Sequence, residues 1–149
     1  MTTAEILTVT PDPGLGEIGT GAAAALARLL ERHGVPVRAR RTVAADDAEA
    51  ERALRQAVEG GGLVVCLGDG DGAETVRQAL ARLVGSRLVL SDRVMDAVAA
   101  AYAERGQAMP RRAEGLALIP QGTTVLPAPR GGEPGLLAET PSALVAILP

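Results

Sequence analysis

A five-residue apolar run at residues 63–67 (LVVCL) constrains the fold of this chain more than any other feature of its sequence. An uninterrupted run of this length is typical of a central parallel strand, which is buried on both faces of its sheet. The run passes directly into Gly68-Asp69-Gly70-Asp71-Gly72, and residues 73–84 then carry apolar side chains at helical spacing. A strand, a glycine-rich turn and a helix in this order predict a parallel sheet with helical crossovers.

The same alternation of strands and helices runs through the first two thirds of the chain. Strands are predicted at residues 6–10 and 35–43, and helices at residues 22–33, 47–59 and 92–105. Thr20, Ser91 and either Asp46 or Asp47 are the expected N-caps of these helices, and Gly34 is expected just beyond the end of the first. Residues 35–43 alternate between apolar and charged side chains, which predicts a strand near the sheet edge with one solvated face.

The last third of the chain has a different character, with short apolar pieces between turns rich in proline and glycine. We expect short strands, some of them antiparallel, that finish the sheet edge at residues 116–119, 124–126, 136–138 and 143–148. The predicted fold class is therefore α/β: a three-layer α/β/α arrangement around a mostly parallel sheet. No linker divides the sequence, so residues 1–149 are expected to form one domain.

Composition and charge exclude several classes of function. The net charge of −3 and the pI near 5.2 argue against a nucleic-acid binder, which needs a positive field. No stretch is long enough to span a membrane, no signal peptide is visible, and the single Cys66 lies in the apolar run. We therefore expect a cytoplasmic protein without nucleic-acid or membrane partners. The abundance of Ala, Arg, Gly and Pro, which GC-rich codons encode, favours a bacterial source.

Two loops are the best candidates for binding a ligand, because ligands of open α/β sheets bind beyond the carboxyl ends of the strands. These loops are residues 11–20 and residues 68–74. Gly68, Gly70 and Gly72 would let the backbone approach a ligand, and the following helix presents free N–H groups.

The acids of the second loop leave two interpretations open. Asp69 and Asp71 form either a solvated turn that caps the helix, or a site in which Mg²⁺ separates them from a phosphate-containing ligand. The arginines of residues 38–41 are expected to form a solvated face, and His33 a surface residue at a helix end.

Three motifs in the last third resemble the amino-terminal, molybdopterin-binding-type domain of the CinA competence/damage-inducible family. They are residues 104–110 (ERGQAMP), 117–126 (ALIPQGTTVL) and 129–135 (PRGGEPG), and the order of elements before them is also similar. The resemblance implies the α/β fold of the enzymes that adenylate molybdopterin and insert molybdenum. It also implies a metal-dependent ADP-ribose pyrophosphatase activity, and a homo-oligomer that is a dimer or a trimer.

The resemblance also implies which residues form the site. The ligand-binding positions would be Asp12, Glu17, Thr20, Gly68, Gly70, Gly72, Gly131 and Gly135. The metal-binding positions would be Asp69, Asp71 and Glu74, with Mg²⁺ as the ion and molybdopterin as a second candidate ligand.

This sequence departs from the family pattern at the polar positions of that site. The glycine loop is about two residues shorter and lacks the Pro-Thr pair, and Ala128 stands where the family has Asn. The family's separate amidase domain is absent from these 149 residues. Three functions follow: a non-catalytic binding or assembly module, a Mg²⁺-dependent nucleotide pyrophosphatase, or a molybdopterin-binding protein of cofactor biosynthesis. The loss of polar ligand-binding groups favours the first.

Overall fold

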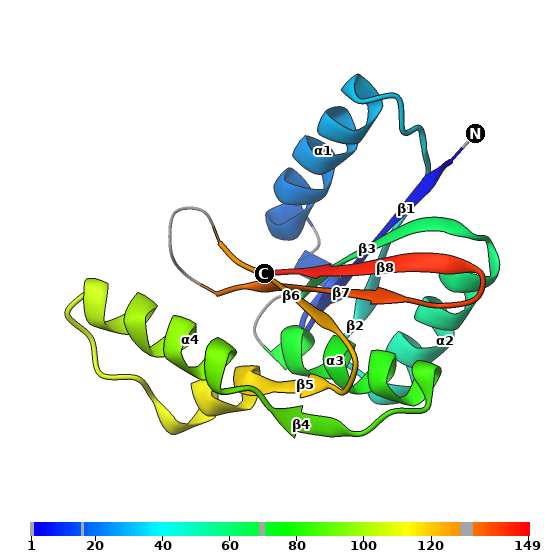
Figure 1. The fold of residues 1–149 in the computed structure, drawn as a ribbon. Helices are drawn as coiled ribbons and strands as arrows, with labels where there is room; N and C mark the ends of the chain where they lie inside the picture. The colour runs from blue at the N-terminus through cyan, green and yellow to red at the C-terminus, as the bar shows by residue number, and fades with distance from the viewer. Residues whose placement is uncertain (1, 16, 69–70, 129–132) are drawn as a thin grey trace.

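Strands and helices alternate along most of the chain, as the computed structural model shows for residues 2–15, 17–68, 71–128 and 133–149 (Figure 1). The strands are β1 (Ala4–Thr10), β2 (Val37–Ala44), β3 (Gly62–Gly68), β4 (Leu88–Leu90), β5 (Leu118–Pro120), β6 (Thr124–Leu126), β7 (Gly135–Glu139) and β8 (Ala143–Leu148). The α-helices are α1 (Glu17–Arg32), α2 (Asp47–Glu59), α3 (Asp71–Val84) and α4 (Asp92–Glu104), and the 3-10 helices are η1 (Pro13–Leu15) and η2 (Arg111–Ala117).

The main sheet has the strand order β2-β1-β3-β8-β7-β6, in which the first four strands are parallel and the last two antiparallel. Alternate residues of β1 point to opposite faces of this sheet. Leu7 and Val9 join the large core under α2 and α3, whereas Ile6 packs against α1. Helices therefore cover both faces, and the predicted three-layer α/β fold with a mostly parallel sheet is confirmed.

Most predicted helix boundaries are confirmed. Asp46 caps α2 by accepting a hydrogen bond from the backbone N–H of Glu49, and Ser91 caps α4 by accepting one from the N–H of Val94. Gly34 follows α1 with a φ of 78°, in the left-handed region that glycine adopts without strain. Thr20 was expected as the N-cap of α1, and this prediction is wrong: the helix begins three residues earlier, at Glu17, and Thr20 lies inside it.

The position of β8 corrects a second expectation. Residues 143–148 were expected to finish the sheet edge, but β8 pairs with β3 in the middle of the sheet, with Gly62 opposite Ala143. Its apolar residues fit this interior position, because Val145 and Ile147 are buried in the core under α2 and α3.

The segment from β4 to β5 lies apart from the main sheet and makes a small one of its own. β4, which the sequence pattern did not reveal, pairs antiparallel with β5, and α4 and η2 lie between these two strands in the chain. Figure 1 shows α4 extending away from the body of the molecule. The expectation that residues 116–119 belong to the main sheet is therefore wrong.

Candidate functional site

Three segments meet at the carboxyl edge of the parallel strands. The first follows β1, the second follows β3, and the third precedes β7, with Pro127, Ala128, Glu133 and Pro134 as its described residues. Because β7 runs antiparallel to β8, its beginning lies at the same edge as the ends of β1 and β3. The two loops expected from the sequence are thus brought together, with the third beside them.

The structure describes some of the predicted ligand-binding residues at this edge. Asp12 is exposed in the loop after β1, where its Oδ1 accepts a hydrogen bond from the N–H of Gly14 at 3.1 Å. Gly135 is buried at the start of β7, opposite Leu126. Glu17 and Thr20 lie in α1, and their side chains are outside the described part of the chain, as are Asp69, Gly70 and Gly131 altogether.

Gly68 and Gly72 have a structural reason to be glycine that needs no ligand. A Cβ on Gly68 would lie 2.5 Å from the Cα of Ala73. A Cβ on Gly72 would lie 2.7 Å from the carbonyl carbon of Val9, and nearer still to its oxygen. These two glycines therefore let the first turn of α3 pack directly on the ends of β1 and β3. Their predicted role at a ligand stays a prediction.

Two of the three predicted metal-binding acids, Asp71 and Glu74, lie in the described part of the second loop. Asp71 and Glu74 both lie exposed in the first turn of α3, and Glu74 accepts a 3.5 Å hydrogen bond from Gln78. Among the described residues, no three His, Cys, Asp or Glu side chains are close enough to hold a metal ion. Asp69, the third predicted ligand, lies outside the described residues, so the magnesium site stays a prediction.

A buried arginine links α3 to the third segment, and sequence reasoning missed it. Only 2% of Arg77 is exposed. Its guanidinium donates to the carbonyl oxygen of Ala73 and pairs with Glu133 at 3.2 Å, while Nε has no partner. The signal was available, because Arg77 lies four residues from both Ala73 and Ala81 and therefore on the buried face of α3. This ion pair holds residues before β7 against the helix that follows the glycine loop.

A second group of buried charges lies near the opposite end of the sheet. Glu5 of β1 is 2% exposed and pairs with Arg38 of β2 at 3.3 Å and with Arg41 at 3.0 Å. Arg38 also donates to the carbonyl oxygens of Ala57 and Gly61. The arginines of residues 38–41 are exposed, as expected, and Arg38 and Arg41 have the further role of neutralising a buried carboxylate.

Cys66 is the neighbour of this group on β3, and it is fully buried. Burial in an apolar environment, and secondly the charge of Glu5, raise the pKa of the Cys66 thiol to about 12. A buried thiol with a raised pKa is a poor nucleophile. The interpretation of Cys66 as a structural residue fits this environment.

Cys66 should therefore be protected from thiol reagents in the folded chain. We expect no labelling by a disulfide reagent at pH 8, and one equivalent of labelling after denaturation. The raised pKa also means that the folded state holds the thiol proton more tightly than the unfolded state does. The contribution of this group to the free energy of unfolding is therefore fully present below pH 9 and falls as the pH rises towards 12. Rapid labelling of the native protein at pH 8 would contradict this prediction.

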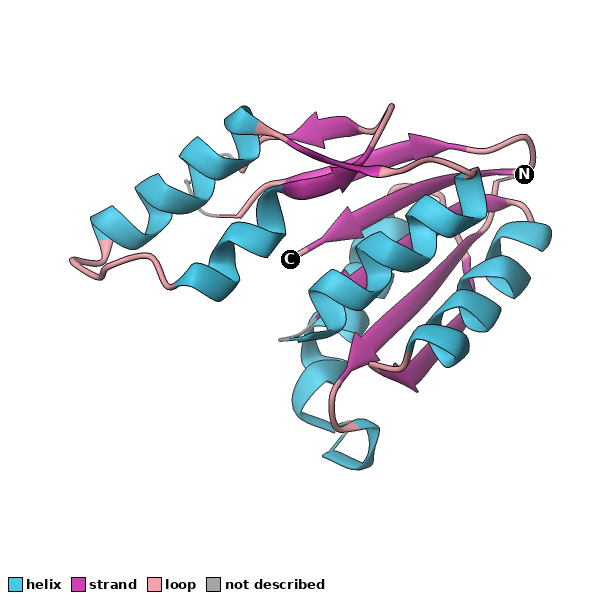
Figure 2. Ribbon diagram, turned by 90° about the horizontal axis from the view of Figure 1, so that it is seen from below, coloured by secondary structure: helices cyan, strands magenta, loops and turns pink. Residues whose placement is uncertain are grey.

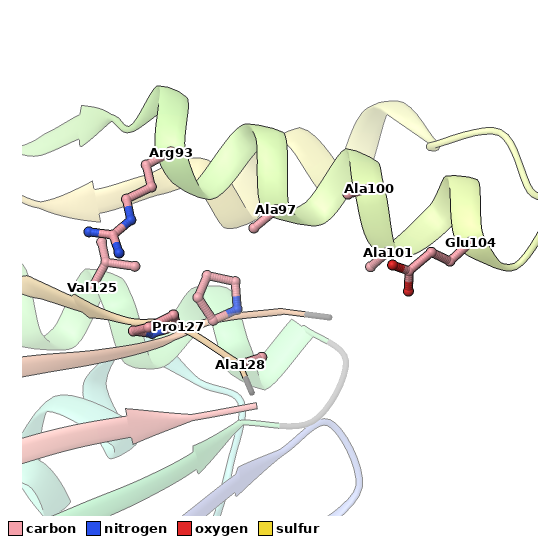
Figure 3. Close-up of a pocket in the computed structure, with 9 residues that line it drawn as sticks. Arg93, Ala97, Ala100, Ala101, Glu104, Val125, Pro127 and Ala128 are labelled. Carbon is pink, nitrogen blue, oxygen red and sulfur yellow. The ribbon is translucent and has the colours of Figure 1, made fainter. Parts of the chain in front are cut away.

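A small apolar pocket lies between α4 and the third segment (Figure 3). Its volume is about 160 Å³. One wall is the alanine face of α4, the opposite wall is formed by Val125 of β6 and by residues 127, 128 and 134, and Arg93 and Glu104 flank the pocket. The lining residues are Arg93, Ala97, Ala100, Ala101, Glu104, Val125, Pro127, Ala128 and Pro134. Such a lining suits a flat apolar group better than a cation.

The fold class is shown by comparison with solved structures. A molybdopterin biosynthesis protein from Mycobacterium abscessus matches 98% of this chain and 79% of its own length, with a TM-score of 0.53 and 18% identity. At that identity the likeness is one of fold alone. The chain has the α/β fold of the molybdopterin-biosynthesis proteins.

More similar proteins identify the family within that fold. The crystal structure of CinA from Thermoplasma acidophilum, a protein of unknown function, matches 99% of this chain and 88% of its own length with a TM-score of 0.79 and 29% identity. A CinA-like protein from Syntrophotalea carbinolica is 35% identical over 133 residues, which are 87% of this chain and 32% of that protein. The chain is a CinA-like domain, and the resemblance noted in its sequence is confirmed.

Four further findings accompany this comparison. No family model matches the chain. The chain spans only part of its curated relatives: 32% of the length of the CinA-like protein from Syntrophotalea carbinolica. It spans 58% of the length of a relative from Pyrobaculum calidifontis. Within the described residues, no helix is both long and apolar enough to cross a membrane. Relatives from Pyrobaculum and Thermoplasma stand beside bacterial ones, so a bacterial source stays a prediction.

Proposed function

We propose that this chain is a CinA-like binding module that holds a small phosphate-containing ligand and does not hydrolyse it. The observation that carries the proposal is the apolar pocket against α4, which opens beside the third segment of the candidate site. A nucleotide or a phosphorylated pterin combines a flat ring with a phosphate group, and the pocket and the start of α3 suit these two parts. Its flat ring would enter the pocket, and its phosphate would meet the backbone N–H groups at the start of α3.

The acids of the glycine loop support the non-catalytic half of the proposal. A metal-dependent pyrophosphatase needs convergent carboxylates that hold the ion against the pyrophosphate and activate a water. The described acids, Asp71 and Glu74, are both exposed, and among the described residues no three His, Cys, Asp or Glu side chains converge on one point. A Mg²⁺-dependent ADP-ribose pyrophosphatase is the alternative that this argument disfavours.

ADP-ribose is therefore expected to stabilise the chain without being consumed. At a hundredfold excess over Kd, binding to the folded state alone adds about 2.7 kcal/mol to the free energy of unfolding. That corresponds to a rise in Tm of several degrees for a chain of this size. The measurement is a thermal-shift titration with and without Mg²⁺, beside a phosphate-release or chromatographic assay of hydrolysis.

Matched variants separate the two halves of the proposal. Ala97→Leu fills the pocket and should abolish the ligand-induced rise in Tm, whereas Ala99→Leu, on the exposed side of the same helix, should leave it intact. Mg²⁺-dependent turnover that disappears in Asp71→Asn/Glu74→Gln would refute the non-catalytic assignment. Absence of stabilisation by ADP-ribose and by molybdopterin would refute the binding assignment.

A further inference from the structure

A guanidinium group is buried at the carboxyl edge of the sheet, beside the start of α3. Helices α2 and α3 lie side by side against one face of the main sheet, as Figure 2 shows from below. The side chain of Arg77 in α3 is only 3% exposed, and its Nη1 donates to the carbonyl oxygen of Ala73 at 3.2 Å. This hydrogen bond turns the guanidinium back towards the first turn of α3, which begins at Asp71.

The residues that the structure describes use only part of the hydrogen-bonding capacity of Arg77. Its Nη2 pairs with Oε1 of Glu133 at 3.2 Å, and its Nε has no partner among them. Nε and Nη2 form the edge with which a guanidinium binds both oxygens of a carboxylate or a phosphate at once. Glu133 therefore occupies one half of this edge and leaves the other half open. A buried donor without a partner costs stability, so it requires an explanation.

A purely structural role does not account for this pair. A buried ion pair is often no more stabilising than apolar residues of similar volume, because both charges must leave water. The two members of the pair also differ in burial: the side chain of Glu133 is 27% exposed, whereas that of Arg77 is 3% exposed. The carboxylate can therefore turn towards solvent. The space that it leaves then connects the Nε and Nη2 edge of Arg77 to the outside.

The surroundings of this edge suit an anion. On one side lies the first turn of α3, where backbone N–H groups and the positive end of the helix dipole favour negative charge. On the other side, Pro134 follows Glu133 directly in the chain and lines the apolar pocket against α4. The acids of the first turn, Asp71 and Glu74, are both exposed, so solvent and salt screen their charges. Arg77 thus contacts both the start of α3 and the segment that walls the pocket.

We propose that Arg77 binds the phosphate of the ligand, and that Glu133 takes the place of this phosphate when no ligand is bound. The inference rests on the proposed binding function and adds to it the residue that receives the phosphate. Phosphate oxygens accept hydrogen bonds from both Nε and Nη2, and the Glu133 carboxylate turns to solvent. A singly charged anion gains little over the carboxylate that it replaces, so the contact with Glu133 favours multiply charged phosphates.

The test uses inorganic pyrophosphate as the probe, in calorimetric titrations of the full chain at constant ionic strength. Arg77→Met and Glu133→Gln remove the same ion pair, but the proposal predicts opposite effects on affinity. Arg77→Met should weaken pyrophosphate binding by about tenfold or more, because it removes hydrogen bonds between charged groups. Glu133→Gln should strengthen binding by about fivefold, because it removes the competing carboxylate.

Two controls make the same changes of charge elsewhere. Arg82, also in α3, and Glu51 of α2 form a 3.9 Å ion pair in which their side chains are 45% and 32% exposed. Arg82→Met and Glu51→Gln should each leave the affinity within about twofold of wild type. Arg77→Lys keeps the charge and loses the edge that binds two oxygens, so its affinity should be intermediate. It replaces Arg77→Met if circular dichroism shows that Arg77→Met does not fold.

Three results would overturn the proposal: no binding of pyrophosphate by wild type and Glu133→Gln, equal binding by Arg77→Met and wild type, or weaker binding by Glu133→Gln. The binding module itself is tested separately, by ADP-ribose and Ala97→Leu. If ADP-ribose stabilises the wild type while neither variant of the ion pair changes pyrophosphate affinity, this inference fails and the module stands. If pyrophosphate affinity follows the predicted order while Ala97→Leu has no effect, the inference stands and the pocket assignment fails.

Discussion

Gly72→Ala is expected to lower the free energy of unfolding by about 3 kcal/mol or more, although alanine is the better helix former. Gly72 lies in the first turn of α3, and a Cβ there would lie 2.7 Å from the carbonyl carbon of Val9 and nearer to its oxygen. The obstacle is the backbone of a central strand, which cannot rotate away as a side chain could. The helix must shift, and the buried residues that pack along it must shift too.

Gly21→Ala is the matched control for this prediction. Gly21 also lies in a helix, and a Cβ there would meet nothing within 4 Å. The same substitution should therefore raise stability by up to about 1 kcal/mol. Urea denaturation of the two variants measures both values. Equal effects of the two substitutions on stability would show that backbone packing does not explain the glycine at position 72. A role in binding a ligand would then be the better explanation.

Arg38→Met is expected to cost about 3 kcal/mol of stability, the second large effect. The substitution removes one of two cations beside Glu5, and it removes the donors that Ala57 and Gly61 use. Loss of one partner from a buried ion pair typically costs 3–5 kcal/mol, because the remaining charge is left without compensation. We place the value at the low end, since Arg41 stays near Glu5 and a quarter of the Arg38 side chain is exposed.

A double variant distinguishes the buried charge from other consequences of losing Arg38. Glu5→Leu/Arg38→Met removes both charges and should recover part of the lost stability, because replacing a buried pair by apolar groups is often neutral. Arg55→Met is the surface control: its pair with Glu51 spans one helical turn and should be worth about 0.5 kcal/mol or less. A double variant that is less stable than Arg38→Met alone would contradict the charge argument.

Much of the fold could be predicted from the sequence because its elements follow periodic rules. The apolar run at residues 63–67 indicated the central strand, and Asp46 and Ser91 indicated helix starts that the structure confirms. The place of β8 could not be obtained in this way. Its pairing with β3 joins residues far apart in the chain. An apolar strand at the edge of a sheet and one in its interior have the same sequence pattern, so the pattern does not distinguish them.

The candidate site was predicted in location but less well in physical detail. Loops at the carboxyl ends of β1 and β3 followed from the parallel topology alone. The meaning of the glycines did not, because a glycine that admits a ligand and one that admits a neighbouring backbone look identical in sequence. Arg77 and Glu133 are 56 positions apart in the sequence, and no local pattern in either segment predicts their ion pair.

The position of β8 also has a consequence for how the chain can be made. A ribosome releases β1 and β3 early, yet β3 obtains its second neighbour only when residues near 143 have emerged. Until then its apolar edge is open to other nascent chains, because half of its backbone groups lack a partner. We therefore expect synthesis to yield no native sheet before the last strand appears, and folding to be slow and cooperative once it does. Truncation before β8 should leave an aggregating fragment and not a smaller domain.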